Sequence, residues 1–228
     1  MDNEKFDINN EETEEATEVN VEEYHAEADE TKAAPKKTNW VKELRDWVIS
    51  ILIAVIVAFV VREYVFTLVK VQGQSMEPSL HNNDRLYVNR FFYTPDKGDV
   101  VIFTPATDPK RPYVKRVIAT EGDTVYIDFR TGKVYVNDQL LEEEYIYEET
   151  REIGNYIADL MQKGQYSKND PIIIQPGYIF VLGDNRNNSK DSRHLGPVPI
   201  DEVMGGAVFR FWPVNNMGTV HQEAEIAD

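Results

Sequence analysis

Cysteine is absent from this chain of 228 residues, and histidine is scarce. The absence of cysteine excludes disulfide bonds, catalysis by a thiol and zinc sites built on cysteine ligands. It does not identify a compartment, because a domain with a large enough core folds without disulfides. Chemistry that depends on an imidazole has only four candidates, which are His25, His81, His194 and His221.

Positive charge is nearly absent from the first 31 residues, which contain thirteen Asp or Glu and a single lysine. This stretch has a net charge of −12, out of −16 for the whole chain, which leaves −4 for residues 32–228. A segment with few apolar side chains and self-repelling charge does not bury enough surface to fold. We therefore expect residues 1–38 to form a disordered acidic tail, whose charge says little about the partners of the folded part.

Long hydrophobic runs are also rare, and the strongest is WVISILIAVIVAFVV at residues 47–61. Its fifteen uncharged residues would rise only about 22 Å as a helix, short of the ~30 Å hydrocarbon core of a bilayer. A buried core helix is therefore one interpretation. The run is apolar on all faces, however, and Trp40, Trp47 and Tyr64 flank it like residues at a membrane interface. We predict one transmembrane helix with its core at 47–61, within an anchor of residues 39–66.

The residues around this run indicate its orientation. Lysine and arginine are more frequent before the run than soon after it, which places the N-terminus in the cytoplasm by the positive-inside rule. The exit from the run, AFVVREYV, is too bulky for a signal-peptide cleavage site, so a retained anchor fits better. Residues 67–228 would then form an extracytoplasmic domain at the cell membrane.

The composition of the sequence changes at residue 70. From there on, about eight short runs are rich in Val, Ile, Tyr and Phe and are separated by turn signals. With no long helical periodicity, this pattern predicts a mainly β domain with a partly closed, antiparallel, β-barrel-like architecture. The stretch TVYIDFRTGKVYVN predicts a hairpin with Thr131 and Gly132 at its tip. Residues 142–170 are more charged and have some helical spacing, and we interpret them as a small inserted region.

A candidate nucleophile occurs in the stretch VQGQSMEPSL. Ser75 lies between Gly73 and Pro78, a mixture that suits neither a helix nor a regular strand, so the chain is expected to bend and present the hydroxyl. Most serines in bends only cap a turn, and a catalytic serine also needs a base.

Two kinds of base could activate Ser75. The first is a histidine, His194, paired with Asp184 or Asp191 in a Ser-His-Asp set. The second is a lysine whose ammonium is desolvated, which lowers its pKa until it can accept a proton. The candidate lysine is Lys115, in the stretch RPYVKRVIATEGD.

Lys115 lies next to Arg116 in a run with strand-like composition. Alternation places Lys115 on the face of Val117, and Arg116 on the opposite face with Ile118. One of the two cations must share a face with apolar residues, but the period of two does not decide which one points inward. The alternative interpretation is a lysine on an edge strand, whose charge disfavours pairing of that edge with another chain.

A dense polar loop follows a hydrophobic strand in FVLGDNRNNSKDSRHLGPVP, residues 180–199. Such a cluster of hydrogen-bonding groups can fix another side chain in place, and Asp191 with Arg193 could form a supporting ion pair. A solvated surface loop is the alternative interpretation.

Three stretches follow one another behind the predicted anchor: GQSMEPSL, KRVIATEGD and GDNRNNSKDSRHLGPV. In this order they closely resemble the type I bacterial signal peptidases over about residues 45–213, and the single anchor and compact insertion resemble the Gram-positive branch. The resemblance implies a membrane-bound serine endopeptidase that removes signal peptides from exported preproteins after small-x-small sites, without metal or cofactor. It also implies secretory preproteins, the lipid bilayer and the export translocon as partners, and no nucleic acid.

The resemblance assigns roles to five residues. Ser75 matches the family nucleophile and Lys115 its general base, which together form a Ser-Lys dyad. Ser189 matches the serine that orients the lysine through a hydrogen bond. Asp191 and Arg193 match the pair that supports the active-site loop.

Relatives build the oxyanion hole from the N–H of the nucleophile and, in some branches, from a serine hydroxyl two residues earlier. Gly73 occupies that earlier position here and supplies no hydroxyl. We expect the substrate to dock as a strand against residues 70–72, just before the serine.

Two other functions are alternatives. A self-cleaving regulator would share the Ser-Lys pair, but the predicted membrane span and the lack of a DNA-binding segment argue against it. A catalytically inactive, membrane-anchored partner of the secretion machinery would be expected to have lost the serine or the lysine, and both are present.

Overall fold

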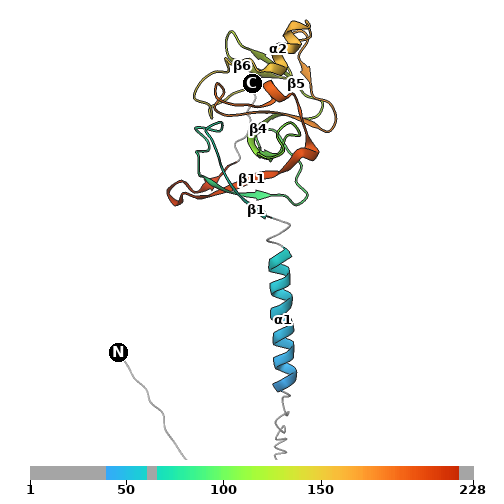
Figure 1. The fold of residues 1–228 in the computed structure, drawn as a ribbon, viewed down its shortest axis with the longest axis vertical. Helices are drawn as coiled ribbons and strands as arrows, with labels where there is room; N and C mark the ends of the chain where they lie inside the picture. Colours follow the sequence, from blue (N-terminus) through green and yellow to red (C-terminus); the bar gives the residue numbers. More distant parts are fainter. Residues whose placement is uncertain (1–39, 61–65, 221–228) are drawn as a thin grey trace, which may run out of the picture. The chain divides into compact units, whose positions relative to one another are not determined.

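The computed structural model describes residues 40–60 and 66–220 (Figure 1). The predicted acidic tail of residues 1–38 lies outside the described residues, and so do residues 61–65 of the predicted anchor. Over the described ranges the chain forms one long helix and a mainly β body.

The long helix, α1 (Trp40–Val60), covers most of the uncharged hydrophobic run. Leu, Ile, Val and Ala dominate it, and it contains neither proline nor glycine to interrupt its backbone hydrogen bonds. None of its side chains is buried. Within residues 40–60 and 66–220, no helix combines the length and the apolar character that crossing a membrane requires, so the predicted transmembrane helix is not identified there.

The larger sheet has eight strands, each antiparallel to its neighbours. Its order is β1 (Phe66–Lys70), β2 (Arg85–Asn89), β11 (Val203–Trp212), β3 (Val100–Phe103), β4 (Tyr113–Ala119), β9 (Tyr178–Leu182) and β10 (Val198–Pro199), with β12 (Gly218–Thr219) paired to β11. The register of β11 shifts against both β2 and β3, and bulges of this kind bend and twist a strand. The sheet curls into a half-barrel (Figure 1), which confirms the prediction of a mainly β domain.

The smaller sheet has four strands, in the order β7 (Gln139–Leu140), β6 (Lys133–Val136), β5 (Thr124–Asp128) and β8 (Ile172–Ile173). β5 and β6 pair in antiparallel register, which confirms the predicted hairpin. Gly132 at its tip has a φ of +80°, and a Cβ there would lie 2.5 Å from Glu149 Cβ, so only glycine fits without strain.

Within residues 66–220, three short helical segments and one longer helix complete the body. The helix α2 (Asn155–Gln162) lies between β7 and β8, within the charged region of residues 142–170, and buries Ile157 in the core. The short segments are α3 (Ser192–Leu195) and two 3-10 turns, Ile200–Glu202 and Val214–Asn216. Figure 1 shows α2, β5 and β6 gathered at one end of the β body, with β1 and β11 at the other.

Buried apolar side chains form three clusters, and β4 contributes to more than one of them. Ile118 packs with the smaller sheet and α2, whereas Val117 packs with Ile179 and Val181 of β9. β4 lies between β3 and β9, so it is an internal strand of the sheet. This position excludes the interpretation of Lys115 as an edge-strand lysine.

Candidate active site

Ser75 lies in the turn that follows β1. Met76 and Leu80, each 1% exposed, anchor this turn in the core, and the Leu80 N–H donates to the Met76 carbonyl at 2.8 Å. Gly73 has a φ of +93° just before the serine, a conformation that glycine adopts readily. Because its apolar neighbours point inward, Ser75 is held half-buried with its side chain beside β4.

Lys115 brings its amine to this hydroxyl from β4. Its Nζ lies 2.7 Å from Ser75 Oγ and 2.9 Å from the carbonyl oxygen of Val114. The residue is only 2% exposed. The structure therefore brings together two predicted site residues that are 40 positions apart in the sequence.

The pKa of Lys115 is lowered from 10.5 to about 8, because burial disfavours the charged ammonium. The carboxylates of Asp191 and Asp184 raise this pKa and oppose the effect of burial, while the charge of Arg193 lowers it further. An amine with this pKa is partly neutral at weakly alkaline pH, and the neutral form can accept a proton.

Arg116, the next residue of β4, is also buried. Its guanidinium donates to Asp184 through Nε at 2.9 Å and through Nη2 at 2.7 Å, and its Nη1 donates to the Gly98 carbonyl at 2.9 Å. Alternation leaves open which of the two neighbouring cations points inward, and the structure buries both of them. The reason is that β4 is internal to the sheet and covered on both faces.

Ser189 lies beside the Ser75 turn, with Gly183 between the two serines. A Cβ on Gly183 would lie 2.2 Å from Ser189 Oγ and 2.5 Å from the Ser75 carbonyl oxygen. The Ser189 hydroxyl is buried close to the Asp191 carboxylate, whose pKa it helps to lower. Within residues 66–220 the hydrogen bonds of Lys115 Nζ go to Ser75 Oγ and to the Val114 carbonyl. The expected hydrogen bond from Ser189 to Lys115 is therefore not formed among these residues.

Asp191 and Arg193 form a fully buried ion pair at the start of α3. Arg193 donates through Nε at 2.8 Å and through Nη2 at 2.7 Å, one bond to each carboxylate oxygen. Burial by itself would raise the pKa of Asp191, but the hydrogen bonds and charge of Arg193 hold it below its usual value. Asp191 also accepts from the Gly183 N–H at 3.0 Å, which connects the pair to the residue that contacts the Ser75 turn.

The geometry does not support a histidine base. His194 Nε2 lies 3.5 Å from Glu152 Oε1, and no hydrogen bond joins His194 to Ser75 in residues 66–220. Asp184 and Asp191 are each paired with an arginine. A Ser-His-Asp set is therefore not assembled.

Asn185 and Arg186 have no individual role predicted from the sequence, yet both support the site. Asn185 donates its N–H to the Ser75 carbonyl and its side-chain amide to the Gln74 carbonyl, each at 3.1 Å. Arg186 is buried and donates from Nε to the Gly183 carbonyl at 3.0 Å. The density of polar residues in this loop signals a hydrogen-bonded cluster, but no local pattern reveals partners that lie far away in the sequence.

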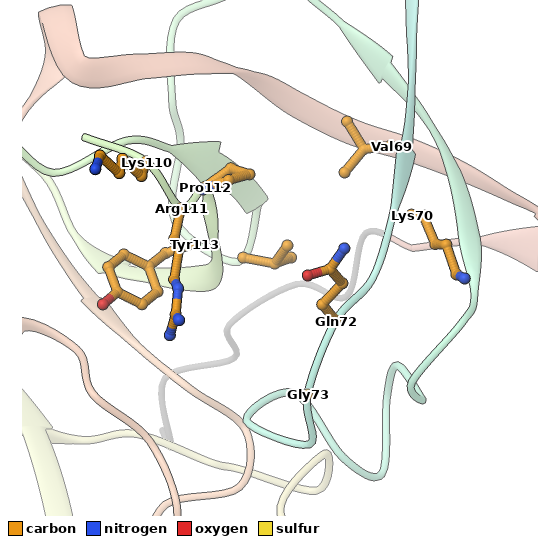
Figure 2. Close-up of a pocket in the computed structure, with 9 residues that line it drawn as sticks. Val69, Lys70, Gln72, Gly73, Lys110, Arg111, Pro112 and Tyr113 are labelled. Atoms are coloured by element: carbon orange, nitrogen blue, oxygen red, sulfur yellow. The ribbon is translucent and has the colours of Figure 1, made fainter. Parts of the chain in front are cut away.

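A cleft of about 500 Å³ lies next to the Ser75 turn. Figure 2 shows Gln72 and Gly73 on one side of it, and Arg111 and Tyr113 on the other. In the described sheet β1 is an edge strand that pairs with β2 alone, so the chain just before the cleft has a free backbone edge. Within residues 40–60 and 66–220, no group of three or more His, Asp or Glu side chains is placed to hold a metal ion.

Several known proteins are similar to this chain. A family model described as signal peptidase, peptidase S26, matches residues 44–212. Signal peptidase IB of Staphylococcus aureus (strain Mu50 / ATCC 700699) is 37% identical over 178 residues, which cover 75% of this chain and 91% of the relative. Signal peptidase I P of Bacillus subtilis subsp. natto is 37% identical over 190 residues, which cover 82% and 96%. A crystal structure of a signal peptidase I from Enterococcus faecalis V583 is 27% identical with a TM-score of 0.35, covering 50% of this chain and 97% of that one.

Proposed function

This chain belongs to the signal peptidase family, peptidase S26, and on that premise we propose that Ser75 is its nucleophile and Lys115 its general base. It is a signal peptidase I, a serine endopeptidase that removes signal peptides from preproteins. The observation that carries the assignment of the two residues is the 2.7 Å approach of Lys115 Nζ to Ser75 Oγ. The lowered pKa of the buried amine supports it.

The reaction follows from these two groups. Neutral Lys115 accepts the proton of the Ser75 hydroxyl while Oγ attacks the scissile carbonyl carbon. The carbonyl oxygen becomes an oxyanion, which the backbone N–H of Ser75 stabilises. When the peptide bond breaks, Lys115 donates its proton to the leaving amine and an acyl-enzyme remains. Lys115 then takes a proton from water, which hydrolyses the ester and restores the serine.

The Ser75 N–H is the oxyanion donor in this proposal. No backbone hydrogen bond from the Ser75 N–H is formed within residues 66–220, so this donor is available to a substrate. Gly73 has no hydroxyl, and its own N–H already donates to Asn82 Oδ1 at 3.1 Å. Gly73 is therefore a poor source of a second donor.

The substrate in this proposal binds in the cleft beside Ser75, as an extra strand along residues 70–72. The support is the free edge of β1 and the cleft that adjoins it. Proline has no N–H, so prolines placed one at a time along a substrate peptide should weaken binding at the paired positions. Unchanged binding by every proline peptide would rule out strand docking.

We also propose that residues 39–66 anchor the protein in the membrane, with residues 1–38 in the cytoplasm and the domain of residues 67–228 outside. The support is the uncharged run on α1 and the excess of lysine and arginine before it. An anchor would hold Ser75 near the emerging cleavage site and raise the local concentration of substrate. Protease added to cells without their wall should digest the domain and spare the tail, and the reverse pattern would contradict this topology.

The catalytic pair is tested by cleavage of a preprotein with the detergent-solubilised full chain at about pH 8.5. Ser75→Ala and Lys115→Met should each lower kcat about a thousandfold or more, because each removes one member of the pair. Methionine fills the volume of the lysine without its amine, and His194→Ala is the matched control, which should retain activity. Activity that survives in Lys115→Met and disappears in His194→Ala would move the base to the histidine. A wild type that cleaves no preprotein would favour the inactive partner of the secretion machinery.

A further inference from the structure

We propose that Glu143 and Tyr145 are positioning residues, which act by holding the loop of residues 183–187 against the Ser75 turn. Both belong to residues 143–152, an irregular segment between β7 and α2 that we call the strap. The inference rests on the catalytic pair proposed above and adds residues that the motifs do not identify. Neither side chain hydrogen-bonds to the proposed nucleophile or base, so their effect would be indirect.

The loop of residues 183–187 fixes the position of the Ser75 turn. Asn185 bonds to the Ser75 carbonyl through its N–H and to the Gln74 carbonyl through its side chain. Gly183 packs so closely on the Ser75 carbonyl that a Cβ would lie 2.5 Å from its oxygen. A shift of the loop would therefore move the proposed nucleophile relative to its base.

Arg186 connects this loop to the strap. Its buried guanidinium donates through Nη2 to Glu143 and through Nη1 to Thr150 Oγ1, the latter at 3.0 Å. Its Nε donates to the Gly183 carbonyl at 3.0 Å. Glu143 is the one carboxylate in ion-pair contact with Arg186 within residues 66–220. Removing that carboxylate would leave a buried cation without its counterion.

Tyr145 connects the strap to both β4 and the loop. Its ring is 6% exposed and has the guanidinium carbon of Arg116 at 4.2 Å from its centroid and that of Arg186 at 5.9 Å. Arg116 follows the proposed base on β4 and holds Asp184 of the loop through two hydrogen bonds. The ring therefore sets the spacing between the strand that carries the base and the loop that holds the nucleophile.

Hydrogen bonds join the strap and the loop at a further place. Asn187 Oδ1 accepts from the N–H of Arg151 at 3.0 Å and from that of Glu152 at 3.2 Å. The strap is thus bonded to the loop at both of its ends, and a displaced strap would displace the loop. A misplacement of about 1 Å can lower a rate about a hundredfold even when the change is far from the reacting atoms.

The test compares Tyr145→Leu, Tyr145→Phe and Glu143→Gln in the full chain, with Tyr147→Leu and Glu144→Gln as controls at exposed neighbours. Tyr145→Leu and Glu143→Gln should each lower kcat about tenfold to a hundredfold while KM stays within about threefold. Tyr145→Phe should stay within about threefold of the wild type, because its ring still faces both guanidinium groups. The two controls should match the wild type.

Two readouts distinguish positioning from a general loss of stability. Burial is what lowers the pKa of Lys115, so a displaced loop that admits water beside its amine would raise that pKa. The rising limb of the kcat/KM profile should therefore move to higher pH in Tyr145→Leu and Glu143→Gln. Hydrogen exchange at the Asn185 amide should become faster in the same variants, and this measurement needs no substrate.

The proposal would be overturned by an unchanged kcat, pH profile and Asn185 exchange in both variants, whatever the change in Tm. Equal losses of activity in Tyr145→Phe and Tyr145→Leu would overturn the role of the ring. Failure of the catalytic pair itself would appear separately, as cleavage that persists in Ser75→Ala. Even then, exchange at Asn185 would decide whether the strap holds the loop.

Discussion

At the scale of single residues, the proposed base Lys115 has a lowered pKa because its surroundings penalise the ammonium ion. Burial lowers its pKa, and the carboxylates of Asp191 and Asp184 limit that lowering, so that the pKa settles at about 8. Each carboxylate is itself paired with an arginine, Arg193 or Arg116, which weakens its pull on the lysine. The basicity of the Lys115 amine therefore depends on two ion pairs as well as on burial.

The pH dependence of catalysis should reflect this pKa. Only neutral Lys115 accepts a proton, and a pKa of about 8 leaves about a tenth of it neutral at pH 7. We therefore expect kcat/KM to rise about tenfold per pH unit below about pH 8 and to level off above it. A pH–rate profile with a fluorogenic signal-peptide substrate measures this, and a profile that is flat between about pH 6 and about pH 9 would contradict a lysine base.

The close packing at Gly183 predicts the effect of one added methyl group. Gly183→Ala would place a Cβ 2.2 Å from Ser189 Oγ and 2.5 Å from the Ser75 carbonyl oxygen, so the Ser75 turn must move. We expect a lower kcat and a loss of about 1–3 kcal/mol in the free energy of unfolding. Gly218→Ala is the control, because a Cβ there meets nothing within 4 Å. Equal kcat and Tm in the two variants would show that the Gly183 contact is dispensable.

At the scale of elements, the site forms where an internal strand, a turn and a loop meet. β4 carries the proposed base, the turn after β1 carries the proposed nucleophile, and the loop after β9 contacts both elements. Two fully buried ion pairs tie that loop to its surroundings: Arg116 with Asp184 joins it to β4, and Asp191 with Arg193 joins it to α3. Removing one partner of such a pair is costly, because the other charge stays buried.

Asp191→Asn should therefore lower the free energy of unfolding by about 3–5 kcal/mol at neutral pH, since Arg193 would lose its counterion. The folded-state pKa of Asp191 is below its usual value, so the stabilisation is present at neutral pH and is lost as the pH falls through that lowered pKa. Urea unfolding measures the loss. Asp159→Asn, which removes an exposed pair with Lys163, is the control and should be nearly neutral. Equal losses in the two variants would argue against a structural role for the buried pair.

At the scale of the whole molecule, charge and apolar character are separated along the chain. The first 31 residues hold −12 of the net charge of −16, and the uncharged run of residues 47–61 follows them. The match to the signal peptidase family begins at residue 44 and ends at residue 212. The residues proposed for catalysis all lie in the β body.

Deletion of residues 1–38 should therefore leave catalysis intact. We expect kcat/KM on a soluble peptide in detergent to stay within about twofold of the wild type, because the deleted residues precede the family match and every proposed site residue. Cleavage assays on the shortened and the full chain measure the ratio. A loss of about tenfold or more would show that the tail contributes to the reaction.

The sequence by itself determined the β character of the domain, the β5–β6 hairpin and the order of the three motif stretches that resemble the signal peptidases. These features are visible in the sequence because alternation, turn residues and motif spacing are properties of neighbouring residues. The same patterns located Ser75 and Lys115 as candidates, but left a histidine base and an edge-strand lysine open.

Only the tertiary structure decided how these residues meet. It placed Lys115 Nζ 2.7 Å from Ser75 Oγ, and it buried Arg116 beside Lys115, where alternation alone suggests one inward cation. It also left Ser189 without a hydrogen bond to Lys115 within residues 66–220, and it placed the Tyr145 ring close to the guanidinium groups of two arginines. The physical reason is that burial and hydrogen bonding here join residues that are 40 and 68 positions apart, and no local period encodes such distant contacts.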